Sequence, residues 1–188
     1  FYNLENLFDT INNVNKNDEA SPIMEIKFNR SGIYKQKVTN MAKVISEIGY
    51  EVTKRPPSII GICEVENRKV VEDLISDEKL KNQNYGIVHY ESPDDRGIDV
   101  GLIYNKDVFL IKNSNSHDVF ITDNNSSKRR NTRDQLVVSG LLDGELLHII
   151  VNHWPSRGAD ETKRIAAAEV NISIIDSLRN IHNNAKII

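Results

Sequence analysis

The sequence predicts a single domain of mixed α/β class, and three observations support this prediction. The 188 residues are 39% hydrophobic and 27% charged, which suits one globular domain with a real core. Apolar runs typical of strands alternate along the chain with segments of helical spacing. Asp143-Gly144 joins two apolar runs, and this dipeptide is typical of a tight antiparallel hairpin. The sheets are therefore expected to be mixed, with hairpins as well as crossover connections.

The N-terminal half is expected to begin with a strand, FYNLENLF, at residues 1–8. Residues 10–33 are rich in Asn, Lys and Asp and are expected to form a long surface loop, which in a compact domain often serves a site. Apolar residues then recur at helical spacing from Tyr34, and Gly49 is suited to end that helix. Next come an apolar strand, SIIGIC, and an amphipathic helix, RKVVEDLISDEKL, at residues 58–63 and 68–80.

The C-terminal half is expected to be richer in strands. Strands are predicted at residues 85–92 and 97–105, around the turn-prone PDDRG, and shorter ones at 108–114 and 118–123. Residues 124–132, NNSSKRRNT, are expected to be a loop, and 135–153 a hairpin. A long helix is predicted at 159–182, where Asp160 and Glu161 favour the positive N-terminus. NAKII at the end has the form of a strand that has just begun.

Composition narrows the classes of function. The net charge is −3, so no broad basic surface is available for nucleic acid, and a nucleic-acid function must depend on a local site and a metal ion. The single cysteine, Cys63, excludes an internal disulfide. Its apolar neighbours favour the neutral thiol, so it is expected to pack as a small hydrophobe and not to act as a nucleophile. No apolar stretch approaches the length of a membrane span.

Four polar residues interrupt or close apolar strand runs: Asn3, Glu64, Asp99 and His153. Ligands collect at strand ends in α/β sheets, so these side chains are expected to converge in one shallow pocket. Glu64 has two interpretations. It caps the following helix and does nothing more, or it binds magnesium together with an amide oxygen, because magnesium prefers oxygen ligands.

Asp99 and His153 also have two interpretations each. Asp99 could point outward from a half-buried strand, and a lone histidine at a strand end is often structural. Alternatively, the Asp99 carboxylate hydrogen-bonds one imidazole nitrogen of His153 and makes the other more basic, for proton transfer or phosphate contact. Arg133 is either a solvated loop cation or a bidentate phosphate clamp. The other four histidines are interpreted as structural: His89, His117, His148 and His182.

Five segments, in this order along the chain, resemble the endonuclease/exonuclease/phosphatase superfamily: FYNLENLFD, GICEVEN, DDRGIDVGLIYN, TRDQLVVSG and VNHWPSRG. The form with NHW and RGIDVGLIY is most similar to bacterial members. The resemblance implies a deoxyribonuclease I-like fold, a four-layered α/β sandwich of two mixed sheets flanked by helices. It also implies a hydrolase of phosphate esters that uses Mg²⁺, with Mn²⁺ as an alternative.

The resemblance assigns roles residue by residue. Asn3 and Glu64 match the residues that approach the metal. His153 matches a histidine that contacts phosphate and transfers protons, and Asp99 falls where a carboxylate pairs with it. Arg133 matches an arginine on the phosphate, and Asn152 is a further candidate for phosphate binding at the rim.

The family's later motifs, Gly-Asp-Phe/Leu-Asn and Ser-Asp-His, do not occur in these 188 residues. Residues 1–188 are therefore expected to be an incomplete domain that lacks its C-terminal part and is inactive alone, with an unpaired strand edge that favours self-association. Three functions remain open: a nuclease acting on nucleic acid, a phosphatase or phosphodiesterase acting on inositol phosphate or phospholipid, and a non-catalytic binding module.

Overall fold

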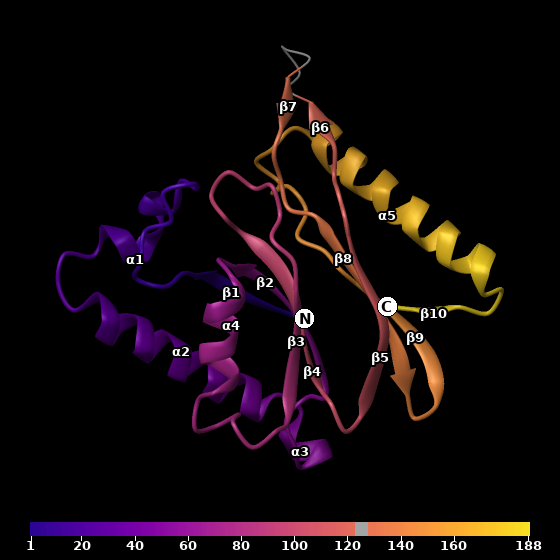
Figure 1. Cartoon of the computed structure of the whole chain (residues 1–188), viewed down its shortest axis with the longest axis horizontal. Helices are drawn as coiled ribbons and strands as arrows, with labels where there is room; N and C mark the ends of the chain where they lie inside the picture. Colours follow the sequence, from indigo (N-terminus) through magenta and orange to yellow (C-terminus); the bar gives the residue numbers. More distant parts are fainter. Residues whose placement is uncertain (123–127) are drawn as a thin grey trace.

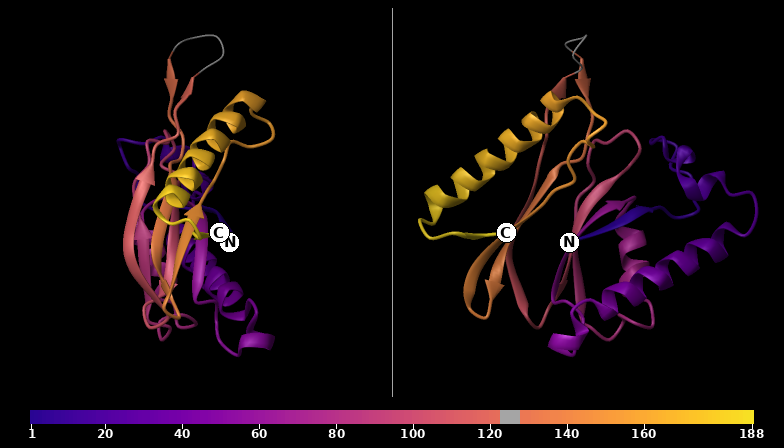
Figure 2. Two further views of the ribbon diagram at one scale, coloured as in Figure 1. Left: turned by 90° about the vertical axis from the view of Figure 1, so that its right-hand side faces the viewer. Right: turned by 180° about the vertical axis from the view of Figure 1, so that it is seen from behind.

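Two four-stranded sheets pack face to face in the computed structural model, which describes residues 1–122 and 128–188. Helices lie outside both sheets, so the layers run helix, sheet, sheet, helix (Figure 1, Figure 2). The mixed α/β sandwich that the sequence predicts is confirmed. No helix in the described ranges is long and apolar enough to cross a membrane.

The first sheet has the strand order β1-β2-β4-β3. Strand β1 is parallel to β2, whereas β2 and β3 both run antiparallel to β4. Helices α2 and α4 cover its outer face with apolar side chains. The bounds of these elements are Tyr2–Leu7 for β1, Arg30–Glu47 for α2, Ile59–Val65 for β2, Arg68–Ile75 for α4, Tyr85–His89 for β3 and Asp99–Asn105 for β4.

The second sheet has the order β10-β9-β8-β5, and helix α5 flanks it (Figure 1). Strand β8 is antiparallel to β5 and β9, and β10 is parallel to β9. The predicted hairpin joins β8 to β9, and Asp143 and Gly144 both have positive φ, 50° and 82°. The bounds are Phe109–His117 for β5, Gln135–Leu142 for β8, Glu145–Val151 for β9, Glu161–Ile181 for α5 and Lys186–Ile187 for β10.

Several short elements differ from the prediction. The expected loop at 10–33 contains a 3₁₀ helix, η1, a short helix, α1, and the first turn of α2, and a further short helix, α3, follows α2. The helix expected at 68–80 ends at Ile75. In the expected loop at 124–132, strand β7 pairs with β6, while residues 124–127 lie outside the described residues. The bounds are Asp18–Ala20 for η1, Pro22–Glu25 for α1, Tyr50–Thr53 for α3, Ile121–Thr122 for β6 and Arg129–Arg130 for β7.

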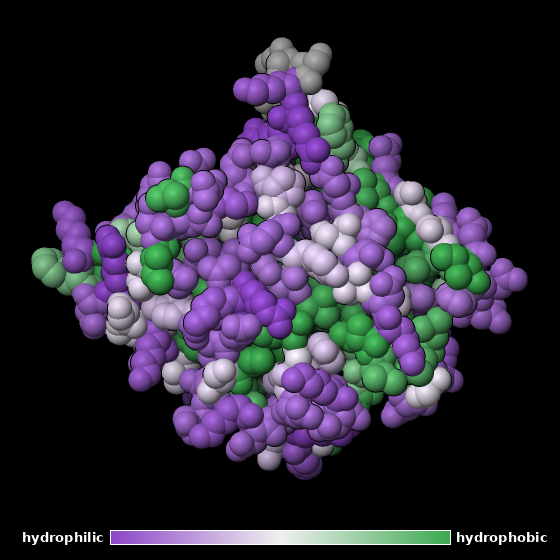
Figure 3. All heavy atoms as spheres, in the orientation of Figure 1, coloured by the Kyte–Doolittle hydropathy of each residue, from purple (hydrophilic) through white to green (hydrophobic). Residues whose placement is uncertain are grey.

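Strand alternation divides the first sheet between two cores. Val100 and Leu102 of β4 face the second sheet and pack with Phe109 and Val138, whereas Ile103 faces helices α2 and α4. Figure 3 shows apolar side chains on the surface between β4 and β5 and mainly polar ones higher on the same face. The apolar residues of β4 therefore alternate between the core under the helices and the core between the two sheets.

Candidate active site

The candidate site begins with two irregularities in the first sheet. The register shifts between Asn3 and Leu7 in β1 and between Cys63 and Val65 in β2. Glu5, Asn6 and Glu64 have positive φ angles of 49°, 57° and 59°, which are uncommon for residues other than glycine. Such irregularities redirect side chains and backbone groups, and here they turn the Asn6 amide toward Glu64.

Glu64 is the centre of the resulting contacts. Its Oε2 accepts a hydrogen bond from the Asn6 backbone amide, and its Oε1 accepts one from the Asn3 side-chain nitrogen, each at 3.0 Å. His153 Nε2 lies 3.4 Å from the same Oε1. Asn3 and Glu64 belong to the first sheet, whereas His153 follows β9 of the second. The site therefore lies where the ends of the two sheets meet.

Asn3 differs in detail from the ligand that the sequence predicts. Its side-chain oxygen accepts a hydrogen bond from the Glu5 amide at 2.7 Å, and its nitrogen donates to Glu64. In this geometry Asn3 orients the Glu64 carboxylate.

His153 is held largely out of water, with 21% of its side chain exposed. Burial lowers the pKa of His153 below its usual value, the nearby Arg133 charge lowers it further, and Glu64 partly opposes both. The imidazole is therefore neutral near pH 7. Its Nδ1 is buried and makes no hydrogen bond to any described residue. A neutral ring with an unsatisfied nitrogen can accept a proton or a further partner.

Arg133 bonds to the backbone of the segment that carries His153. Its Nε and Nη2 donate to the carbonyl oxygen of His153 at 3.1 and 2.9 Å, and Nη2 also donates to that of Trp154 at 3.0 Å. Its Nη1 lies 3.4 Å from Asp94, and the two side chains are only 9% and 5% exposed. Arg133 precedes β8, lines the cleft and, in this geometry, bonds to the protein's own backbone. Its expected role as a phosphate clamp stays a prediction.

The expected hydrogen bond between Asp99 and His153 is wrong. Asp99 Oδ2 lies 3.1 Å from His89 Nε2, and Oδ1 accepts the Ser92 backbone amide at 2.8 Å. His89 ends the neighbouring strand β3 and lies opposite Gly101, two residues from Asp99, so the two side chains can meet. His153 contacts Glu64. His89, interpreted as structural, is the partner instead.

An open cleft of about 740 Å³ lies beside Glu64 and His153. Asn152 is not among its lining residues, although its side-chain oxygen is buried without a hydrogen bond to a described residue. Sequence reasoning missed several lining residues, although they stand in the PDDRG and HWPSRG segments or just beyond: Asp94, Arg96, Trp154 and Lys163. Their proximity to the motifs was the available signal.

A hard divalent cation fits this donor set. Glu64 supplies carboxylate oxygens at the cleft, with 19% of its side chain exposed, and Asn3 fixes its orientation. Magnesium usually takes one or two carboxylates, keeps several waters and uses substrate phosphate oxygens for the rest. His153 Nδ1 and the Asn152 side-chain oxygen are buried near this edge without a hydrogen bond to a described residue.

Comparison with known proteins shows the family and the fold. The family model described as "Endonuclease/Exonuclease/phosphatase family" matches residues 1–188. No curated protein sequence gives a significant match.

Three solved structures are similar in fold. An endonuclease/exonuclease/phosphatase from Bacteroides vulgatus is 16% identical, with a TM-score of 0.52, over 80% of this chain and 55% of that one. TDP2 from Caenorhabditis elegans is 14% identical, with a TM-score of 0.58, over 92% and 44%. The human Nocturnin catalytic domain, solved with a bound sulfate anion, is 18% identical, with a TM-score of 0.51, over 80% and 54%. The chain thus spans about half the length of these structures, and it belongs to the endonuclease/exonuclease/phosphatase family.

Proposed function

We propose that the chain carries part of the active site of a metal-dependent phosphodiester hydrolase that acts on nucleic acid. One observation carries the proposal: the Glu64 carboxylate and the neutral His153 imidazole, from two different sheets, lie 3.4 Å apart at the edge of an open cleft. A carboxylate for a cation beside an imidazole for a proton is the pair of functions that phosphodiester hydrolysis requires.

Glu64 is proposed as the ligand of Mg²⁺ or Mn²⁺, and Asn3 as the residue that orients it. When bound, the cation would stabilise the negative charge that develops on phosphate oxygens. His153 is proposed to take up a proton at the reacting phosphate, which its lowered pKa permits at neutral pH. Arg133 donates hydrogen bonds to the His153 and Trp154 carbonyls and is proposed to fix the position of the imidazole at the cleft.

Nucleic acid is proposed as the substrate because of the cleft lining. The cations Arg96, Arg130 and Lys163 line the cleft with Trp154, which is 39% exposed. A cationic groove that carries an aromatic ring is suited to a sugar–phosphate chain with stacked bases. The overall charge of −3 confines this attraction to the cleft, so binding is expected to be local.

The test uses the natural protein with labelled single-stranded and double-stranded DNA and RNA, and with a small inositol phosphate, in Mg²⁺, Mn²⁺ or EDTA. Glu64→Gln removes the charged ligand with little change of shape, and His153→Gln removes the titratable ring. Each is expected to lower the rate by roughly 10²–10⁴-fold. Glu47→Gln, an exposed carboxylate at the end of α2, is the matched control and should leave the rate unchanged.

Cleavage of nucleic acid that EDTA abolishes and Glu64→Gln strongly reduces would support the proposal. Release of phosphate from the inositol phosphate alone would replace nucleic acid with a small substrate. A natural protein with no metal-dependent hydrolysis of any of these substrates would refute the proposal and favour a binding module.

A further inference from the structure

A second cluster of metal-ligating side chains lies on the first sheet. His89 ends β3, Glu91 follows two residues later, and Asp99 begins the neighbouring antiparallel strand β4. His89 is opposite Gly101 in the register, so Asp99, two residues away, is on the same face. One ligand atom from each of the three residues lies within 4.8 Å of the other two, and no other group in residues 1–122 and 128–188 has this property.

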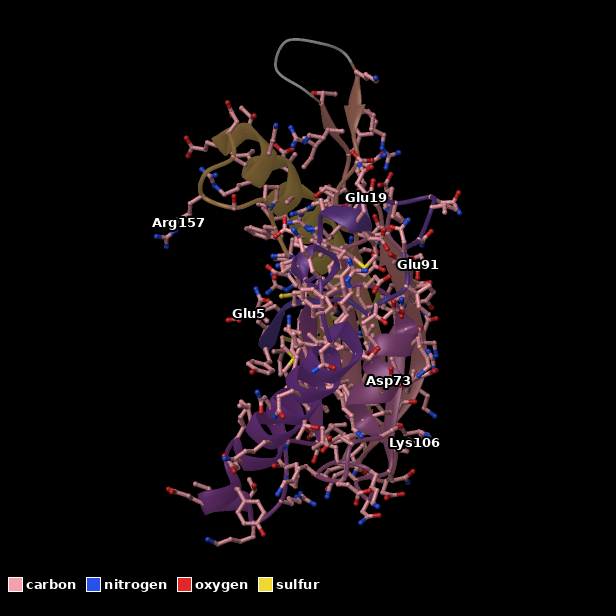
Figure 4. All side chains as sticks on the ribbon, turned by 90° about the vertical axis from the view of Figure 1, so that its left-hand side faces the viewer. Glu5, Glu19, Asp73, Glu91, Lys106 and Arg157 are labelled. Carbon is pink, nitrogen blue, oxygen red and sulfur yellow. The ribbon has the colours of Figure 1, made fainter. Side chains whose placement is uncertain are left out.

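The cluster is separate from the candidate active site. Among the described residues, the side-chain contacts of Glu64 and His153 involve none of the three residues. Figure 4 shows Glu91 and Arg157, which follows the histidine segment, on opposite sides of the molecule. A ligand at His89, Glu91 and Asp99 would therefore not be the cation proposed at Glu64.

Two of the three side chains are almost completely buried and already oriented. The His89 and Asp99 side chains are 3% and 0% exposed, and the Ser92 amide fixes one Asp99 oxygen. The remaining Asp99 oxygen lies 3.1 Å from His89 Nε2. Donors that are each about 2.1 Å from one ion lie roughly 3.0–3.4 Å apart in octahedral or tetrahedral geometry. The 3.1 Å between Asp99 Oδ2 and His89 Nε2 lies within this range.

The Glu91 carboxylate makes no hydrogen bond or ion pair with a described residue. The ammonium of the nearby Lys16 is bonded to the carbonyls of Ser92 and Asp94 and not to Glu91. The Glu91 oxygens can therefore join His89 and Asp99 around one ion.

We propose that His89, Glu91 and Asp99 bind a divalent transition metal such as Zn²⁺. One imidazole nitrogen with two carboxylates suits a transition metal better than magnesium, which prefers oxygen alone. The exposed position of Glu91 leaves room for a water in the coordination shell. The ion would join the end of β3 to the start of β4 and so fix the connecting segment, which carries Asp94 to Arg133.

The test is titration of the metal-stripped protein with Zn²⁺ by calorimetry and with Co²⁺ by visible absorption, which reports nitrogen ligation independently of activity. The wild type and Glu64→Gln are expected to show the same affinity for the nitrogen-ligated Co²⁺ and for Zn²⁺ at this cluster. Glu91→Gln should weaken binding by at least tenfold and abolish the rise in Tm that Zn²⁺ produces. Glu91 is exposed, so this variant should fold, and Glu19→Gln is the exposed control.

Binding that Glu91→Gln leaves unchanged would overturn the proposal, and so would an absence of Zn²⁺ and Co²⁺ binding at micromolar concentration. In both cases the contact between His89 and Asp99 is a structural hydrogen bond only. Loss of binding in Glu64→Gln with retention in Glu91→Gln would place the metal at the candidate active site instead and would equally overturn it.

Discussion

Arg133→Met tests whether Arg133 is a scaffold residue or a phosphate clamp. Methionine keeps the apolar stem of the side chain but removes its donors to His153 and Trp154. It also removes the buried cation beside Asp94, whose side chain is 5% exposed and keeps only the exposed Arg96 as an ion-pair partner. At 3.4 Å the gross attraction of the pair is about 5 kcal/mol at an effective dielectric of 20. Removing one partner of a buried pair typically costs about 3–5 kcal/mol. The expected fall in Tm is then about 6–20 °C.

The assay is urea and thermal unfolding of Arg133→Met, Asp94→Asn and the double variant. Asp94→Asn retains an oxygen for the Arg96 amide, so the double variant should be more stable than Arg133→Met alone. The coupling energy should be about 1–3 kcal/mol. Arg157→Met, at an exposed arginine that projects away from the ribbon in Figure 4, should cost under about 0.5 kcal/mol. A stable Arg133→Met that folds normally and loses only substrate affinity would contradict the scaffold role and restore the clamp.

Three further outcomes are expected. Lys37 Nζ donates to the backbone carbonyls of Glu5 and Asn6 at 2.5 and 2.9 Å. Lys37→Met should therefore loosen the β1 irregularity and lower the rate of hydrolysis of labelled nucleic acid roughly tenfold, and Lys37→Arg should restore part of that rate. Burial lowers the pKa of His148, and the nearby His182 lowers it further. The unfolded chain therefore binds more protons than the folded one, and the free energy of unfolding falls as the pH drops below about 6.5. His148→Gln should flatten this fall between pH 7 and 5, as measured by urea titrations. Gly144→Ala should cost about 1–2 kcal/mol in the same titrations because its φ is 82°.

Features set by local sequence were predictable. The β8–β9 hairpin follows from Asp143-Gly144, and α5 follows from its apolar spacing and its first-turn acids. The short elements at 18–25 were not predictable, because nothing local distinguishes them from a loop. Lys16, just before them, bonds to the carbonyls of Ser92 and Asp94, about 76 residues further along the chain. Contacts between distant segments therefore decide the conformation of this excursion.

The meeting of Asn3, Glu64 and His153 was also predictable, because each stands at the end of an apolar strand run. Their roles in hydrolysis stay a prediction. The residues behind them were harder to foresee. Asp94 has the same sequence signal as Asp95 beside it, yet the Asp94 side chain is 5% exposed and contacts Arg133. The Asp95 residue is exposed, and its side chain accepts a hydrogen bond from Asn131. Sequence alone does not tell which of two adjacent acids turns inward.

Asp99 shows why strand position alone does not identify a site residue. Glu64 and Asp99 lie on paired strands near the same sheet end, with Val65 opposite Asp99. In a regular strand Glu64 would share a face with Ile62, which belongs to the core under the helices. The positive φ of Glu64 breaks this alternation, so that Val65 joins that core while Glu64 turns to His153. Asp99 contacts His89 on the neighbouring strand β3 instead. Because a one-residue irregularity exchanges the two faces, the side chain's partner depends on a backbone feature that no residue pattern here reveals.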